Sequence, residues 1–385
     1  MLQFIADWLK SAGCDFPGLR LMDYVSFKAA LAAFLSIIIA FISGKKIIAW
    51  LQRKQIGETI RNLGLEGQMQ KKGTPTMGGV IIILSVVVSA LLVCDLRNTY
   101  VILLLITTLW CGGIGFLDDY IKVFKHNKEG LSERKKLILQ FTLGLGIALM
   151  MCFSESIHTD NLITTIPFVK AHEFDYSWLS PFNGQAGVYC SWSIYMLMII
   201  FVILACSNGA NLTDGMDGLS TGVSMIVGIV IGVMAWLSGD VLDSRYLNIM
   251  FIPGTDEVAV FMAAFVGALI GFLWYNTFPA QVFMGDTGSL AIGGIIGVSA
   301  VLIRKELLLP LLCGIFLMES LSVLIQRYWF KFTRKKYGEG RRVFLMAPLH
   351  HHYQKKGIPE PRIVTRFWII AILLGVGTLV LMKIR

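Results

Sequence analysis

Charged residues are scarce in this chain. Of its 385 residues only 15% are Asp, Glu, Lys or Arg, whereas 55% are hydrophobic and the mean hydropathy is +0.68. A soluble globular domain ordinarily carries about 25% charged residues, so this composition excludes that class. We predict an all-α, polytopic integral membrane protein in which residues 1–385 form a single transmembrane domain.

Cysteine motifs and repeats are missing as well. The seven cysteines show no C-x-x-C spacing and lie mostly at or inside apolar runs, which argues against a disulfide framework and against a cysteine-based zinc site. No internal repeat is evident, which disfavours a transporter built from duplicated halves. A cleavable signal is not expected either, because Asp7 and Asp15 interrupt the N-terminus and Lys45-Lys46 follow the first long apolar run.

Long apolar runs are abundant. We count about ten, each long enough or nearly long enough to cross a bilayer as a helix. The two shortest, 192–206 and 289–303, are the weakest candidates. The runs centre on residues 25–43, 77–94, 100–117, 137–153, 192–206, 220–238, 258–275, 289–303, 306–325 and 367–382.

Positive charge is distributed unevenly. The net charge is +9, and most Lys and Arg residues fall in the segments 45–72, 122–136 and 327–366. The positive-inside rule assigns such segments to the cytoplasm. Two spans separate the first segment from the second and six separate the second from the third, so all three share one side. We therefore expect both termini outside the cytoplasm, and nucleic-acid binding is not needed to explain the charge.

Three polar stretches lie where apolar runs stop. The longest is Asn208–Leu219, NGANLTDGMDGL; the others are Asp118-Asp119 and the GDTG of Gly285–Gly288. Carboxylates next to membrane-grade segments are costly unless they face water, a metal ion or a polar partner. Taken singly, each could be an ordinary polar loop or a solvated helix end. The glycines of GDTG could also present backbone N–H groups to a phosphate at the start of the eighth span.

The parity of the spans places these stretches on one face. Five aspartates converge on the cytoplasmic side beside the basic segments, together with His350–His352: Asp118, Asp119, Asp214, Asp217 and Asp286. Carboxylate oxygens suit Mg²⁺ or Mn²⁺, and neighbouring cations suit a polyanionic substrate. The combination indicates phosphoryl transfer at a membrane surface. The histidines are a poor zinc site and fit phosphate binding or proton handling better. Glu319, within the ninth span, could simply hydrogen-bond a neighbouring helix.

Smaller features give local expectations. Gly73 and Pro75 should break structure before the second span, and Ser132 should cap the helix that leads into the fourth. The outside segment 154–191 carries no evident chemistry, and a short strand is expected around 163–169.

Five motifs together resemble one family. KKGTPTMGG (71–79), GFLDDY (115–120), NLTDGMDGL (211–219), NTFPAQVFMGDTGS (276–289) and APLHHHYQ (347–354) look like the motifs of the phospho-N-acetylmuramoyl-pentapeptide transferases. These belong to the polyprenyl-phosphate N-acetylhexosamine-1-phosphate transferase superfamily. The aspartate motifs are shared across the superfamily, whereas PLHHH and GTPTMGG point to the muramoyl-pentapeptide branch.

The resemblance implies a reaction and its partners. Phospho-MurNAc-pentapeptide would pass from UDP-MurNAc-pentapeptide to undecaprenyl phosphate, giving lipid I and UMP in peptidoglycan synthesis. Mg²⁺ would be the cofactor, with Mn²⁺ as a substitute. The enzyme would be a multi-pass protein of the bacterial inner membrane, in contact with the lipid bilayer and with its active site on the cytoplasmic face. The family often forms homodimers.

The resemblance also implies residue roles. Asp286 would ligate the metal, and Asp118 would deprotonate or orient the lipid phosphate. Asp119 beside it would help with the metal or the phosphate, and His350 would contact phosphate. Lys122 and Lys125 would contact phosphate or carrier lipid, and His351 and His352 would line the sugar-phosphate side. Phe283 would stack on uracil. The remaining nucleoside-pocket residues would be Lys71, Thr76, Asn211, Leu212, Asp214, Gly215, Asp217 and Asn276.

Two other functions and two mechanisms stay open. A sister transferase that moves GlcNAc-1-phosphate would share the aspartates, and an ion-coupled transporter could also hold intramembrane carboxylates. Clustering at one membrane face rather than near the midplane disfavours the transporter. Within the transferase reading, the lipid phosphate could attack directly, or an aspartate could first form a phospho-enzyme.

Overall fold

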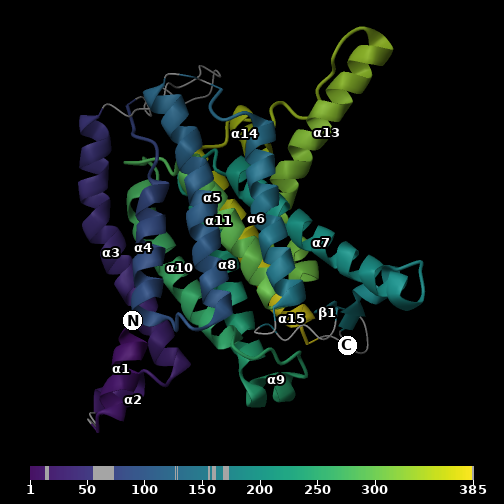
Figure 1. Cartoon of the computed structure of the whole chain (residues 1–385). Coiled ribbons are helices and arrows are strands. Elements are labelled where there is room, and N and C mark those ends of the chain that lie inside the picture. The colour runs from purple at the N-terminus through teal and green to yellow at the C-terminus, as the bar shows by residue number, and fades with distance from the viewer. Residues whose placement is uncertain are drawn as a thin grey trace.

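The protein is a bundle of helices. The computed structural model describes residues 1–13, 17–54, 73–125, 127, 129–154, 157, 162–167 and 173–383, and within them it contains only two short strands. This confirms the predicted all-α class (Figure 1). The elements are α1 (Leu2–Ser11), α2 (Pro17–Leu21), α3 (Val25–Arg53), α4 (Gly79–Val93), α5 (Thr99–Phe124), α6 (Glu133–Phe153), β1 (Ile163–Thr165), β2 (Glu173–Asp175), η2 (Tyr176–Leu179), α7 (Gly184–Thr213), α8 (Leu219–Gly239), α9 (Val241–Leu247), α10 (Thr255–Asn276), α11 (Gly285–Leu302), η3 (Glu306–Leu308), α12 (Leu309–Leu312), α13 (Gly314–Tyr337), α14 (Leu349–Lys355) and α15 (Glu360–Leu381).

The apolar runs form the long helices of the bundle. In the described chain eight helices are long and apolar enough to cross a membrane, and the bent pair formed by η3–α12 and α13 would make a ninth. The helix α4, with 15 residues, is shorter. All ten predicted runs therefore coincide with helices, and a multi-pass membrane protein is confirmed. The exact number of crossings and the side on which the termini lie stay predictions.

The helix α11 runs through the middle of the bundle. Every residue from Thr287 to Leu302 is buried, and the helix packs mainly on α5 and α7. Its sequence is rich in Gly, Ala and Ser, which lets neighbouring backbones approach closely, as small residues do between membrane helices. At Gly115 of α5 an added Cβ would overlap the Asp286 carbonyl oxygen. This close approach brings the start of α11 against the end of α5.

Buried polar side chains also connect the helices close to the start of α11. Gln140 of α6 is fully buried; its Nε2 donates to Ser207 Oγ at 3.1 Å, and its Oε1 accepts from Asn208 Nδ2 at 2.9 Å. Ser207 Oγ in turn donates to the Leu290 carbonyl at 3.1 Å. An unsatisfied polar group in hydrocarbon costs several kcal/mol, so these bonds fix α6, α7 and α11 relative to one another.

The polar stretch that begins at Asn208 is mostly helical, which corrects the predicted loop. The helix α7 continues to Thr213, so the connection to α8 is only residues 214–218. The polar side chains of this last part of α7 find partners on the helix itself: Asn208 Nδ2 donates to the Leu204 carbonyl at 2.8 Å, and Thr213 Oγ1 to the Gly209 carbonyl at 2.8 Å. Gly218, with φ +76°, turns the chain into α8.

The predicted ninth span is broken. The axes of η3–α12 and α13 differ by 76°, with the break at Cys313, and α13 continues to Tyr337, well beyond the predicted end of the run. Figure 1 shows the C-terminal end of α13 projecting from the bundle. The apolar run 306–325 predicted the helix but gave no indication of the bend.

Several local expectations are corrected in detail. Of the strand expected around 163–169, residues 163–165 form β1, which pairs antiparallel with β2, and residues 168 and 169 lie outside the described part of the chain. Helices α1, α2 and α9 form outside the ten predicted apolar runs. Ser132 occupies the N-cap position of α6, but its side chain makes no capping hydrogen bond.

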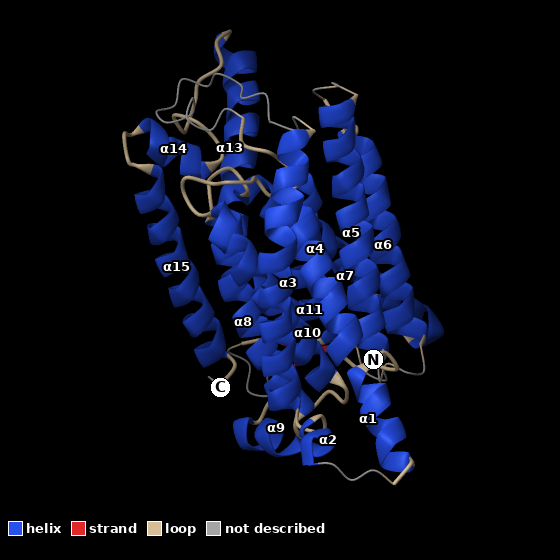
Figure 2. Ribbon diagram, turned by 90° about the vertical axis from the view of Figure 1, so that its left-hand side faces the viewer, coloured by secondary structure: helices blue, strands red, loops and turns tan. Residues whose placement is uncertain are grey.

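The basic segments gather at one end of the bundle. Helix α1 and the end of α15 lie at one end, whereas α14 and the C-terminal end of α13 lie at the other (Figure 2). The described parts of the three basic segments belong to that second end, where α3 and α5 finish and α6 begins. This arrangement agrees with the parity argument from the sequence.

Candidate active site

Three carboxylates meet at the second end of the bundle. Asp118 and Asp119 come from the last turns of α5 and Asp286 from the first turn of α11, and one carboxylate oxygen of each lies within 4.8 Å of the others. Asp118 and Asp119 are buried, and Asp286 is half-buried. Like charges held this close repel one another unless cations compensate them.

Two lysines supply that compensation. Lys122 Nζ lies 2.6 Å from Asp118 Oδ2 and 3.1 Å from Asp286 Oδ2. Lys136 Nζ, from the first turn of α6, lies 3.0 Å from Asp118 Oδ1 and 2.6 Å from Asp286 Oδ2. Asn211 Nδ2 of α7 donates to Asp286 Oδ1 at 2.9 Å. The cluster thus gathers acidic and basic groups from α5, α6, α7 and α11.

Asp119 differs from the other two carboxylates in what it binds. Its oxygens accept from the Asp286 N–H at 3.2 Å, the Thr287 N–H at 2.9 Å and the Thr287 hydroxyl at 2.6 Å. These bonds cap the N-terminus of α11, where unpaired N–H groups favour a negative partner. Within GDTG, Asp119 therefore occupies the N–H groups of Asp286 and Thr287, so these two amides are already engaged inside the protein.

The segment around Thr76 is joined to the segment before α11. The Phe283 N–H donates to the Pro75 carbonyl at 2.8 Å, and the Gly78 N–H donates to the Phe283 carbonyl at 2.8 Å. Thr76 is buried next to Gly285, where an added Cβ would lie 3.0 Å from Thr76 Oγ1. Two motifs about 200 residues apart in the chain therefore form one wall of the site, with Phe283 half-buried in it. Lys71 lies outside the described residues.

Asp217 and Asn276 bind the protein's own backbone. Asp217 Oδ2 accepts from the Ala280 N–H at 3.0 Å. Asn276 Oδ1 accepts from the Gly218 N–H at 3.1 Å and from Thr221 Oγ1 at 2.9 Å, while its Nδ2 donates to the Val282 carbonyl at 3.0 Å. Both side chains are buried. They tie the α7–α8 connection to the α10–α11 connection, which positions the wall that carries Phe283.

His350 is enclosed between Glu319 and the α7–α8 connection. The His350 ring is fully buried, its Nδ1 lies 3.1 Å from Glu319 Oε2, and its backbone N–H donates to Glu319 Oε1 at 3.2 Å. A Cβ at Gly215 would collide with His350 Nε2, so the absence of a side chain there makes room for the ring. Glu319 of α13 thus hydrogen-bonds a residue of the neighbouring helix α14 and fixes the orientation of this histidine. Asp214, on the same connection, and Leu212, in the last turn of α7, are half-buried.

The three histidines do not point to one place. His351 Nδ1 pairs with Gln354 Oε1 at 3.1 Å, and its ring packs on that of His350 with centroids 4.3 Å apart. His352 Nδ1 accepts from the Leu345 N–H at 3.1 Å and faces the segment before α14. Consecutive residues of a helix differ by about 100° in direction, which explains the divergence. Lys125 is exposed beyond α5, and among the described residues its side chain forms no hydrogen bond or ion pair.

The bond to Leu345 leads to a pH prediction. Burial, and then the charge of Lys356, lower the pKa of His352 from its ordinary value. A lowered pKa favours the neutral ring in the folded state, so this contribution to stability is complete above the unfolded value of about 6.5 and is lost as the pH falls through the folded value. We expect the melting temperature of the wild type to fall relative to that of His352→Gln as the pH is lowered from about 7 to about 5. A constant difference over this range would contradict the assignment.

Comparison with known proteins agrees with this geometry. The model of glycosyl transferase family 4 matches residues 101–304, which is more than half of the chain, and signature 1 of the phospho-N-acetylmuramoyl-pentapeptide transferases matches residues 71–83. Relatives of that name are 51% identical in Parabacteroides distasonis, over 100% of both chains, and 53% identical in Flavobacterium psychrophilum, over 96% of this chain and 97% of the relative. A relative in Bacteroides fragilis is 44% identical over 100% of both chains. The chain belongs to the phospho-N-acetylmuramoyl-pentapeptide transferase family. It is an enzyme, a transferase of glycosyl transferase family 4.

Two residues that were not predicted from the sequence contact the predicted site residues of this transferase. Lys136 contacts two of the three carboxylates, yet in the sequence it is one of several lysines in a basic segment and has no distinguishing pattern. Glu360, at the start of α15, accepts from the Asp217 N–H at 2.8 Å and so extends the framework of the site to the last helix. Only the packing of α5, α6 and α11 identifies Lys136.

The donor set of this transferase fits a divalent cation. Three carboxylates whose oxygens lie within 4.8 Å of one another offer the hard oxygen ligands that Mg²⁺ and Mn²⁺ prefer. Asp118 Oδ2 and Asp286 Oδ2 are engaged by lysine side chains, and Asp118 Oδ1 also accepts from the Leu131 N–H at 2.6 Å, whereas both oxygens of Asp119 are committed to α11. Asp286 and Asp118 are therefore better placed than Asp119 to exchange a lysine for a metal ion.

Proposed function

We propose that the protein transfers phospho-MurNAc-pentapeptide from UDP-MurNAc-pentapeptide to undecaprenyl phosphate, in the first membrane step of peptidoglycan synthesis. A phosphate oxygen of the lipid would form a bond to the sugar-bearing phosphorus. The bond from that phosphorus to the UMP oxygen would break, and UMP would leave with the electron pair. The products are lipid I and UMP. The names and full-length identity of the relatives support this reaction, and the cluster of three carboxylates and two lysines carries the proposal.

The acidic cluster would supply the charge control that this reaction needs. Asp286, with Asp118 beside it, would hold Mg²⁺ or Mn²⁺, whose charge would offset that of the donor pyrophosphate. Asp118 would orient the acceptor phosphate or take its proton, and Asp119 would keep Asp286 in place by capping α11. Lys122 and Lys136 lie within hydrogen-bond distance of the carboxylates and can turn to phosphate oxygens.

The nucleoside end of the donor would lie along the neighbouring wall. Phe283 would stack on uracil, with Asn211, Leu212, Asp214, Gly215 and Thr76 around the nucleotide. Asp217 and Asn276 would act by positioning this wall, because their polar atoms already bond backbone groups. His350, held by Glu319, would contact phosphate, with His351 packed beside it on the sugar-phosphate side. Lys125, exposed at the end of α5, would face the headgroup of the carrier lipid; His352 is assigned no substrate contact.

The membrane placement follows from the same observations. We assign the end of the bundle that carries the acidic cluster to the cytoplasmic side of the bacterial inner membrane, because the basic segments lie there. A soluble nucleotide donor would reach the cluster from the cytoplasm, and a lipid phosphate would reach it from the bilayer. The proposal includes a homodimer only because members of this family often form homodimers.

The test measures transfer of phospho-MurNAc-pentapeptide by the purified protein in detergent. With labelled UDP-MurNAc-pentapeptide and undecaprenyl phosphate we expect a lipid-linked product and UMP, both lost on chelation of Mg²⁺ and restored by Mg²⁺ or Mn²⁺. UDP-GlcNAc serves as the competing donor. Preferential use of UDP-GlcNAc would replace the proposal by the sister reaction, and no product from either donor would reject it. A phospho-enzyme trapped with donor alone would select the two-step route.

A further inference from the structure

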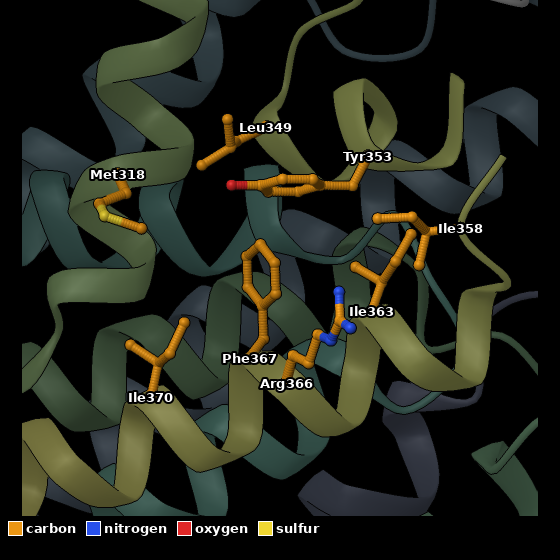
Figure 3. A pocket seen from close by; sticks show the side chains of 8 residues that line it. All are labelled: Met318, Leu349, Tyr353, Ile358, Ile363, Arg366, Phe367 and Ile370. Atoms are coloured by element: carbon orange, nitrogen blue, oxygen red, sulfur yellow. The ribbon is translucent and has the colours of Figure 1, made fainter. Parts of the chain in front are cut away.

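A small apolar pocket lies between α13, α14 and α15. Its accessible volume is about 150 Å³, and its walls include Met318, Leu349, Tyr353, Phe367, Ile370 and Arg366 (Figure 3). Binding pockets for whole small molecules usually span about 300–1,000 Å³, so this one suits part of a chain rather than a nucleotide. Met318 and Ile370 are 41% and 38% exposed, so the pocket is continuous with the outer surface of the helices.

One cation borders this apolar space. Arg366 is exposed, and within the described part of the chain its guanidinium forms no hydrogen bond or ion pair. Figure 3 shows its side chain extending from α15 beside Ile363, at the end of the pocket away from Met318 and Ile370. Arg366 lies six residues, about 9 Å along the axis, from Glu360 at the start of α15. An arginine at this depth extends its head toward the interface, where lipid phosphates lie.

We propose that the pocket binds one anionic phospholipid of the inner leaflet, with an acyl segment between Met318, Phe367 and Ile370 and the phosphate on Arg366. An apolar pocket ending in an unpaired arginine matches an apolar chain ending in a phosphate. The inference depends on the proposed placement of α14 at the cytoplasmic side, but not on the transfer reaction.

The position of the pocket favours a phospholipid over the carrier lipid. The reacting phosphate must lie at the acidic cluster of α5 and α11, whereas the pocket is built by α13, α14 and α15. Figure 2 shows α15 on the side of the bundle away from α5 and α6. A lipid whose phosphate is on Arg366 therefore stands apart from the phosphoryl acceptor.

The bound lipid would also support His350. Leu349 and Tyr353 face the pocket from α14, and His350, between them in the chain, faces Glu319 and Gly215. The helix α14 has only seven residues and depends on its neighbours for stability. An acyl chain against Leu349 and Tyr353 fills the space behind it, so lipid binding should order α14.

The test compares lipid retention by two arginine variants. Native mass spectrometry of the full-length protein, with phosphatidylglycerol or phosphatidylcholine added and no donor or acceptor, would count bound lipids. Arg366→Gln should weaken the most tightly held phosphatidylglycerol by about tenfold. Arg134→Gln, an exposed arginine in the first turn of α6, should leave it unchanged. Hydrogen exchange within α14 should slow on addition of phosphatidylglycerol in the wild type but not in Arg366→Gln.

Each other outcome would overturn the proposal. Equal retention by Arg366→Gln and wild type would remove the arginine from the site. Displacement of phosphatidylglycerol by an equal amount of undecaprenyl phosphate would assign the pocket to the carrier. Loss of a dimer, rather than of lipid, in Arg366→Gln would show that a second copy covers this face. As a second variant, Met318→Trp fills the pocket and leaves Arg366 in place; unchanged lipid retention there would reject the acyl position.

Discussion

Replacing Asp286 by asparagine is expected to lower the turnover number about 10²- to 10³-fold, the scale seen when one preorganised charge-stabilising group is removed from an active site. Its carboxylate accepts from Lys122, Lys136 and Asn211 and is the only one of the three at the start of α11. The amide keeps the shape but removes the negative charge. The measurement is UMP release at increasing Mg²⁺, together with Mn²⁺ binding followed by electron paramagnetic resonance without substrates.

The matched control is Asp243→Asn on α9, at the end of the bundle that carries α1. It removes one carboxylate of the same kind and should keep both activity and Mn²⁺ binding. Full activity and unchanged metal affinity in Asp286→Asn would show that the metal assignment is wrong. Lost activity with unchanged metal affinity would shift the role of Asp286 to positioning Lys122 and Lys136.

Adding a single methyl group at Gly115 is the second change with a large expected effect. A Cβ there would overlap the Asp286 carbonyl oxygen and lie 2.5 Å from Thr287 Cα. Because both contacts are backbone, α5 and α11 must move apart, and overpacking of this kind costs about 1–3 kcal/mol. A displacement of roughly 1 Å between catalytic groups can cost about 10²-fold in rate. We expect Gly115→Ala to lose at least that much activity and to melt at a lower temperature.

Gly113→Ala provides the control on the same helix. A Cβ at Gly113 meets no atom within 4 Å, so this variant carries the same gain in helix propensity without the collision. It should retain activity and melt at or above the wild-type temperature. If both variants behaved alike, the close approach of α5 and α11 would not be what sets the geometry of the acidic cluster.

The convergence of the acidic groups could be predicted from the sequence. The alternation of apolar runs and basic segments predicted that Asp118, Asp119 and Asp286 share one end of the bundle, and the structure brings their oxygens together. The acidic groups could be placed together because hydrocarbon leaves the chain few choices: an apolar run forms a helix, and a polar segment lies at an interface. The family motifs identified the same residues independently.

Other features depended on packing that no local pattern shows. Lys135 and Lys136 are adjacent and chemically identical, but only Lys136 faces Asp118 and Asp286. Asp217 and Asn276 carry ligand-like groups, yet the backbone of neighbouring connections takes up their hydrogen bonds. The divergence of His350 and His352 could have been foreseen only if the short helix α14 had been recognised. Sequence patterns show which groups are available; tertiary contacts decide which of them are already engaged.

The bonds from Asp119 to the first amides of α11 have a consequence for any redesign of this centre. They couple the end of α5 to the start of α11 so that the two move together, although about 165 residues separate them along the chain. A change at Asp119 would shift the neighbouring acidic group as well as remove a charge, so its phenotype would combine defective assembly with defective chemistry. A design that transfers the acidic cluster to another scaffold would have to keep the bonds between Asp119 and the first amides of α11.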